Sequence, residues 1–180
     1  MIQQLSKARV QETKDLVRRV FPHQGPIESG FHWAWLRQEQ PLVRWLMRLA
    51  GVAAIEDTWV YVDDAGHVRG TIGLYATTRD SHEARWVSWF CVDPDARGLG
   101  IGKALLDNLV AVVRERGWRF LRLYTGSDPD EARAQVLYES RGLREVRRVF
   151  KPLWGYHKIY RELELATVAA EVGDQATPRG

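Results

Sequence analysis

The segment from residue 86 to residue 92 reads WVSWFCV and is largely apolar on both alternating sets of positions. Successive side chains of a strand point to opposite faces of its sheet, so a strand of this kind must be covered on both sides. The segment therefore predicts a central strand in a sheet with helices on both faces. Asp93 and Pro94 end it, because proline has no N–H to donate to a neighbouring strand.

The flanking sequence supplies the other elements of such a sheet. We expect a short strand and a helix within residues 5–20, and two helical pieces, separated by Pro41, within residues 30–50. Further strands are predicted at 58–62, 67–75, 120–124, 143–150 and 156–165, with helices ending near Arg116 and Ser140. The fold predicted is α/β, a single domain over residues 1–165 with a mixed central sheet of six to seven strands. A disordered tail is predicted at 166–180.

Composition excludes several classes of protein. A chain of 180 residues is long enough for one domain with its own core. It has no apolar run near the roughly 20 residues of a membrane span, and its first residues do not resemble a secretory signal. Cys91 is the only cysteine, so no internal disulfide forms, and we expect a cytoplasmic protein.

The net charge of +3 favours anionic ligands only weakly. The densest basic group is Arg141, Arg144, Arg147 and Arg148, with glutamates among them. We interpret this group as a solvated edge rather than a phosphate contact, because a nucleic-acid binder typically carries a basic stripe on one face. No nucleic-acid partner and no membrane partner are predicted.

A glycine-rich loop joins the central strand to the following helix. Glycine allows a sharp turn and the close approach of a ligand to the backbone, and the first N–H groups of a helix have no intrahelical acceptor. The run therefore predicts a pyrophosphate cradle, with a plain glycine-rich turn as the alternative. Its spacing excludes the dinucleotide fingerprint and the P-loop. The residues concerned are Arg97, Gly98, Leu99, Gly100, Ile101, Gly102 and Lys103.

Two motifs resemble those of the GNAT superfamily of acyl-CoA-dependent N-acetyltransferases. The family's phosphate loop follows the pattern Gln/Arg-x-x-Gly-x-Gly/Ala after a strand ending Val-x-Pro, and RGLGIG at 97–102 is similar to it. The segment AQVLYESRGL at 134–143 resembles the family's A-x-x-L-Y-E-x-x-G-F, with Leu143 in place of Phe. The resemblance covers residues 58–165 and implies an N-acetyltransferase domain over residues 1–165.

The resemblance implies direct attack of an amine on the thioester of acetyl-CoA, the cosubstrate. The freed backbone of Phe90, Cys91 and Val92 would bind the pantetheine arm, and an N–H there would polarise the thioester carbonyl. The pyrophosphate would lie on residues 98–103. Tyr138 matches the family's proposed general acid toward the thiolate; the alternative is a packed aromatic that positions the sulfur.

The resemblance leaves the general base open. The two positions where family members carry a glutamate hold Trp86 and Tyr124, and Glu131 replaces the family's asparagine. The remaining candidates are His82, Glu83, Asp128 and Glu28, and a water relay is an equal alternative.

Other features point away from covalent or metal chemistry. Cys91 lies in an apolar strand with no histidine close in sequence, so we reject a cysteine nucleophile, and the five histidines show no metal-ligand spacing. Phe31, Trp33, Trp35 and Trp45 are expected mostly to pack on the sheet, with one or two lining an acceptor pocket. The acceptor predicted is a primary amine of a small molecule or peptide. The alternatives are a non-catalytic acyl-CoA-binding module and a protein N-terminal acetyltransferase, and a homodimer is an open possibility.

Overall fold

A seven-stranded mixed sheet forms the centre of the molecule, in a computed structural model that describes residues 1–22, 31–152 and 155–165. The strand order is β1-β2-β3-β4-β5-β7-β6, and every neighbouring pair is antiparallel except β4 and β5. The strands are β1 (Ile2–Gln4), β2 (Val52–Val62), β3 (Val68–Thr77), β4 (Ala84–Val92), β5 (Phe120–Gly126), β6 (Arg144–Lys151) and β7 (Tyr156–Glu164).

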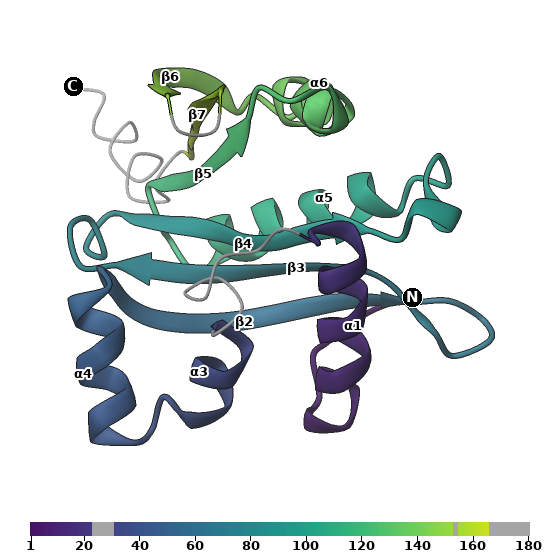
Figure 1. The fold of residues 1–180 in the computed structure, drawn as a ribbon, viewed down its shortest axis with the longest axis horizontal. Helices are drawn as coiled ribbons and strands as arrows, with labels where there is room; N and C mark the ends of the chain where they lie inside the picture. Colours follow the sequence, from purple (N-terminus) through teal and green to yellow (C-terminus); the bar gives the residue numbers. More distant parts are fainter. Residues whose placement is uncertain (23–30, 153–154, 166–180) are drawn as a thin grey trace, which may run out of the picture.

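Helices cover both faces of this sheet, which confirms the predicted fold class (Figure 1). The first face carries α1 (Val10–Val20), α3 (Phe31–Arg37) and α4 (Pro41–Leu49), and the second carries α5 (Ile101–Glu115) and α6 (Ala132–Ser140). Short 3-10 turns η1 (Lys7–Arg9), η2 (Pro94–Ala96) and η3 (Pro129–Glu131) precede α1, the glycine loop and α6. Pro41 occupies the first turn of α4, where its missing N–H costs nothing.

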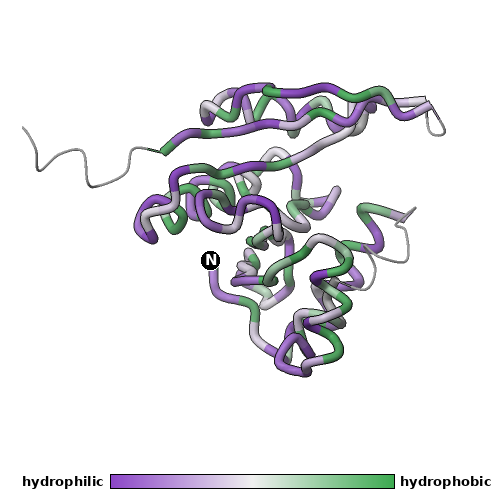
Figure 2. The backbone as a smooth tube through the Cα atoms, turned by 90° about the vertical axis from the view of Figure 1, so that its left-hand side faces the viewer, coloured by the Kyte–Doolittle hydropathy of each residue, from purple (hydrophilic) through white to green (hydrophobic). Residues whose placement is uncertain are grey.

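Two large buried clusters, and a smaller one formed under α4 by Val43, Met47 and Ile55, hold these layers together. On the α5 face, Leu105 and Leu109 pack with the strand residues Ile72, Leu74 and Leu121. On the α1 face, the buried side chains include Leu16, Val17, Val60, Val62 and Cys91. β4 is fourth of the seven strands and contributes to both clusters, as its double-sided composition predicts. Figure 2 shows hydrophilic and hydrophobic residues interspersed along the β6–β7 hairpin, which lies at the sheet edge.

The structure corrects the predicted position of the first strand and does not describe the predicted tail. The first strand lies at Ile2–Gln4, ahead of the predicted segment, because its position is set by pairing with residues 59–61 of β2 rather than by its own hydrophobicity. The tail at 166–180 lies outside the described residues. In the described ranges, no helix combines the length and the apolar character that crossing a membrane requires.

Candidate active site

The central strands β4 and β5 pair along only part of their length. Ala84, Arg85 and Trp86 are in register with residues 120–122, and the pairing stops there although β4 continues to Val92 and β5 to Gly126. The other edge of β4 remains paired with β3 as far as Val92. A stretch of β4 backbone from residue 87 to residue 92 therefore faces the divergence, where a ligand backbone can pair with it.

A β-bulge lies within this stretch. Gly73 of β3 pairs with Ser88 and Thr71 pairs with Cys91, so β4 has one extra residue between the two pairs. Trp89 takes a φ of 45°, which is costly for a side chain of this size. Because of the extra residue, Trp89 packs on the α1 side, while Phe90 packs on the α5 side. Bulges of this kind are frequent beside active sites because they redirect side chains.

The glycine loop is open and its donors are unused. Gly98 and Gly100 have φ values of 83° and 77°, and a Cβ built on either meets no atom within 4 Å. In the described part of the chain, no hydrogen bond uses the six main-chain N–H groups from Gly98 to Lys103, and the first helical bond is Ala104 N–H to Gly100 O at 2.9 Å. Six unused donors at and just before the N-terminus of a 15-residue helix are able to bind an anion.

Gly102 differs from the other two glycines. It lies inside α5, and a Cβ there would meet Val92, Leu137 and Phe90 at 3.4–3.5 Å, which is ordinary contact. Alanine therefore fits at this position without strain, and only Gly98 and Gly100 need a residue without a side chain for backbone reasons.

A buried carboxylate fixes the start of this loop. Asp93 is 1% exposed, accepts the N–H of Asp95 at 3.2 Å, and pairs with Arg69 at 3.1 Å and Arg19 at 3.5 Å. These contacts tie the end of β4 to β3 and α1 at once. Asp93 thus holds in place the loop that precedes the unused donors.

Replacing Asp93 with alanine is expected to destabilise the fold by about 2–3 kcal/mol, because Arg69 loses a buried partner while keeping Asp63. For a chain of this size this lowers the melting temperature by roughly 5–10 °C. The control is Asp15→Ala, which removes two exposed contacts, the ion pair at 3.8 Å with Arg18 and the hydrogen bond at 3.0 Å from Gln11, and should change the melting temperature by less than about 2 °C. Equal melting temperatures for the two variants would contradict the anchoring role.

Tyr138 lies beside the unpaired stretch of β4. Its ring is 5.9 Å from that of Phe90, and the side chain is 6% exposed. Burial, with the nearby Glu131 adding to it and Arg161 opposing it, raises the pKa of the Tyr138 phenol above its usual value. The phenol is therefore protonated throughout the physiological range.

Arg161 of β7 binds α6, the helix that carries Tyr138, and so fixes the position of Tyr138. Its buried guanidinium donates to Leu143 O at 3.1 Å, to Gln135 Oε1 at 3.0 Å and to Glu139 Oε1 at 2.7 Å. Gln135 in turn donates to Gly126 O at 2.8 Å, at the end of β5. The helix that carries Tyr138 is thus tied to both strands on the far side of the divergence.

Among the other predicted site residues, Arg97, Leu99 and Lys103 are exposed at the loop, Ile101 is buried beneath it, and Val92 packs on the same side as Phe90. Cys91 points the opposite way, into the α1 cluster. The structure therefore brings Phe90, Val92, Tyr138 and the glycine loop together on the α5 side. Only the backbone of Cys91 belongs to this site.

Burial raises the pKa of the Cys91 thiol to about 12, so little thiolate exists at neutral pH. We expect Cys91→Ala to keep turnover within about threefold, and the native thiol to resist iodoacetamide near pH 8 until the protein is unfolded. Peptide mapping of the alkylated protein with and without urea provides the measurement. Rapid native alkylation with parallel loss of activity would contradict this.

The two positions where the resemblance would place a carboxylate base hold Trp86 and Tyr124. Trp86 donates its indole N–H to Asp80 at 2.9 Å, and Tyr124 lies with the Lys158 ammonium 3.3 Å from its ring centroid. Glu83 pairs with Arg122 at 3.0 Å. His82 and Asp128 are exposed on loops, and Glu28 lies outside the described residues.

Glu131 lies near the end of β5 and accepts a hydrogen bond from the Thr125 hydroxyl. Burial raises the pKa of this carboxyl. In the described ranges no group of three or more His, Cys, Asp or Glu residues could hold a metal ion; the absence of a metal remains a prediction.

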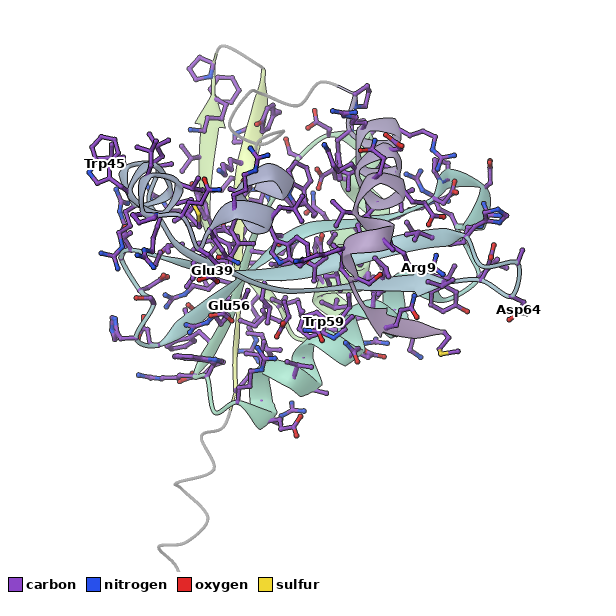
Figure 3. All side chains as sticks on the ribbon, turned by 90° about the horizontal axis from the view of Figure 1, so that it is seen from below. Arg9, Glu39, Trp45, Glu56, Trp59 and Asp64 are labelled. Carbon is purple, nitrogen blue, oxygen red and sulfur yellow. The ribbon has the colours of Figure 1, made fainter. Side chains whose placement is uncertain are left out.

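The aromatic residues of α3 and α4 behave differently from one another. Trp35 is partly buried against both the α1 cluster and the cluster under α4. Trp45 is 56% exposed and projects outward from α4 at the edge of the molecule (Figure 3), so it neither packs on the sheet nor faces the divergence. The side chains of Phe31 and Trp33 lie outside the described part.

Three features of the site escaped the sequence reasoning. The bulge at Trp89 has no local marker, since no glycine or asparagine stands there. Asp93 could have been singled out as a carboxylate between a buried strand and a glycine run. Arg161 could have been singled out as a charged residue at an inward-facing position of an alternating strand.

Comparison with known proteins gives one family. The model of the acetyltransferase (GNAT) domain matches residues 54–145, just over half of the chain. A stretch of 55 residues is 44% identical to the mycothiol acetyltransferase of Beutenbergia cavernae, covering 31% of this chain and 18% of that protein. The matched stretch thus spans less than a fifth of that relative.

Solved structures share the fold. The ribosomal-protein-S18-alanine N-acetyltransferase of Escherichia coli matches with a TM-score of 0.67 at 17% identity, over 99% of each chain. The yncA protein of Salmonella typhimurium, solved with acetyl-CoA, matches with a TM-score of 0.67 at 18% identity, over 99% of this chain and 97% of that one. At these identities the likeness concerns the fold alone.

Proposed function

The chain belongs to the GNAT acetyltransferase family, and from this premise we propose that it transfers an acetyl group from acetyl-CoA to a primary amine of a small molecule or peptide. One observation carries the proposal: six unused main-chain N–H groups lie at the start of α5, beside an unpaired edge of the central strand. In CoA a diphosphate is joined directly to an arm that contains amide groups. A protein that binds both parts needs free N–H donors for the diphosphate beside an unpaired strand edge for the arm.

The residues present suit this cosubstrate. The N–H groups of Gly98 to Lys103 would hold the diphosphate, with Arg97 and Lys103 adding charge from the rim. The backbone of Phe90, Cys91 and Val92 would pair with the pantetheine arm. Acetyl-CoA supplies an acetyl group activated as a thioester.

In the proposed reaction, the β4 backbone and Tyr138 have different roles. An N–H of the β4 edge polarises the carbonyl under attack. Tyr138, held by α6 beside Phe90, donates its proton to the departing sulfur. We assign no side-chain base, because Asp80 and Glu83, the carboxylates near Trp86, are paired with Arg122. An amine that enters uncharged needs only water to accept its proton.

Binding and catalysis are tested separately. CoA at about 100 times its Kd should stabilise the fold by about 2.7 kcal/mol, which raises the melting temperature by roughly 5–10 °C. Release of free thiol from acetyl-CoA in the presence of an amine panel then measures transfer. An unchanged melting temperature at millimolar CoA would rule out the proposed function.

A second candidate is a non-catalytic acyl-CoA-binding module. It is favoured by the absence of a carboxylate at the Trp86 and Tyr124 positions. It predicts the same melting shift with no thiol release for any amine. The cytoplasm, where a single cysteine stays reduced, remains the proposed location.

A further inference from the structure

A cluster of aromatic and basic side chains lies on β5, β7 and β6 at the divergence from β4. Tyr124 is in register with Tyr160, and Tyr160 with Arg147, so the three share one face. The Tyr124 and Tyr160 rings are 6.3 Å apart, and the Arg147 guanidinium is 5.6 Å from the Tyr160 ring. The Lys158 ammonium is 3.3 Å from the Tyr124 ring centroid and 5.5 Å from that of Tyr160. We call these four residues the basic aromatic wall.

The wall faces away from the CoA side of the sheet. Arg161, the residue next to Tyr160 on β7, points to the opposite face and binds the α6 residues Gln135 and Glu139. Across the divergence, Trp86 of β4 meets Tyr160 edge to face at 6.4 Å. The wall therefore lies beside the divergence on the face opposite α5 and α6. Tyr124 is 43% exposed there, so an acceptor can reach the wall.

Charge on this face is divided between two ends. Where β4 and β5 are still paired, Asp80, Glu83 and Glu162 surround Arg122 with N–O distances of 2.6–3.0 Å, leaving three carboxylates to one cation. Burial alone would raise the pKa of Asp80, but hydrogen bonds from Thr77, Arg122 and Trp86 outweigh it and lower that pKa, so the carboxylate stays charged. At the diverging end lie Lys158 and Arg147, and Arg147 has no ion pair among the described residues.

This separation of charge suits a molecule with a positive group at one end and a negative group at the other. An ammonium group is attracted to the acidic end before it loses its proton, and an anion is attracted to the basic end. The rings between the two ends favour a planar or apolar spacer. We propose that the acceptor is an amine that carries an anionic group, a carboxylate or a phosphate, separated from the amine by an apolar or aromatic spacer. The proposal rests on the proposed acetyl transfer and names its substrate class.

Three matched acceptors test the charge requirement. In 4-(aminomethyl)benzoate, 4-(aminomethyl)benzamide and benzylamine the reacting amine and ring are the same, and only the far substituent changes. We expect kcat/KM for the benzoate to exceed that for the benzamide by about tenfold or more, because a charge-assisted hydrogen bond is roughly twice as strong as a neutral one. Equal values for the two would overturn the proposal while leaving acetyl transfer established. A fourth acceptor, 4-(aminomethyl)phenyl phosphate, carries a phosphate in place of the carboxylate. The anion that the wall prefers is the one whose acceptor gives the higher kcat/KM.

The variant that tests the wall is Arg147→Gln combined with Lys158→Gln, which keeps polar, though shorter, side chains and removes both charges. The benzoate-to-benzamide ratio of kcat/KM should fall to about one. The control is Arg148→Gln: the neighbouring residue pairs with Glu145 at 2.8 Å and is in register with Ile159, on the opposite face. A ratio retained in the double variant, or lost equally in the control, would overturn the assignment.

Binding separates this proposal from the proposed function. Calorimetric titration of the three compounds into the CoA-saturated protein gives affinities without turnover. Tighter binding of the benzoate by about tenfold, lost in the double variant, supports the wall even if no thiol is released, in which case acetyl transfer alone fails. Equal or absent binding of all three overturns the wall, whereas the melting shift with CoA still reports on the cofactor site.

Discussion

Replacing Gly100 with valine is expected to abolish the rise in melting temperature that CoA produces. Gly100 has a φ of 77° and open space where a side chain would project. A β-branched residue there costs about 1–2 kcal/mol in backbone strain and shifts the donors on either side of it. If two hydrogen bonds to the diphosphate are lost at about 1.5 kcal/mol or more each, CoA affinity falls on the order of 100-fold.

The matched control is Gly117→Val at the other end of α5. Gly117 has a φ of 73° and equally open space, so both variants carry the same kind of strain. The ends of a 15-residue helix are about 22 Å apart, so Gly117 cannot touch a ligand at the loop. Both variants should melt lower than the parent, and only Gly117→Val should respond to CoA. A CoA response retained by Gly100→Val, or lost in both, would remove the cradle from the mechanism.

Replacing Tyr138 with phenylalanine is expected to lower kcat by about 100-fold or more while CoA binding stays unchanged. The ring and its contact with Phe90 remain, so only the proton that would reach the departing sulfur is removed. Positioned general acids contribute roughly 100-fold to 10,000-fold to rate. Steady-state kinetics at saturating amine, together with the CoA melting shift, separate turnover from binding.

The control for this prediction is Tyr61→Phe, which removes a phenol that packs against the same core from β2. It should leave kcat within about twofold. If Tyr138→Phe retains full turnover, Tyr138 only packs against the arm and does not donate the proton.

The pH profile gives a second check on Tyr138. Burial, first, and then the nearby Glu131 raise the pKa of its phenol above the usual value near 10. A raised pKa keeps the acid form present as pH rises, so the rate should not decline between about pH 8 and about pH 10. An alkaline decline in that range that disappears in Tyr138→Phe would show that the phenol ionises there.

Short-range patterns were enough to predict several parts of this protein. The double-sided apolar run at 86–92 predicts a central strand, and β4 is the fourth of seven. The glycines at 98 and 100 follow from the positive φ that the loop requires. Tyr138 is placed on a helix by its neighbours. Each of these depends on residues within a few positions of one another, where steric rules and periodicity act directly.

The chemistry of the site depends on longer-range arrangements. The sequence does not show where β4 and β5 separate, because this depends on the bulge at Trp89 and on the pairing of β5 with β7 along its other edge. It does not show that Asp93 joins β3 and α1, that Trp45 points outward from α4 (Figure 3), or that Tyr124 and Tyr160 share the face opposite α6. These are contacts between residues far apart in the chain, and their energies exist only after the strands have paired and the helices have packed, so no local pattern records them.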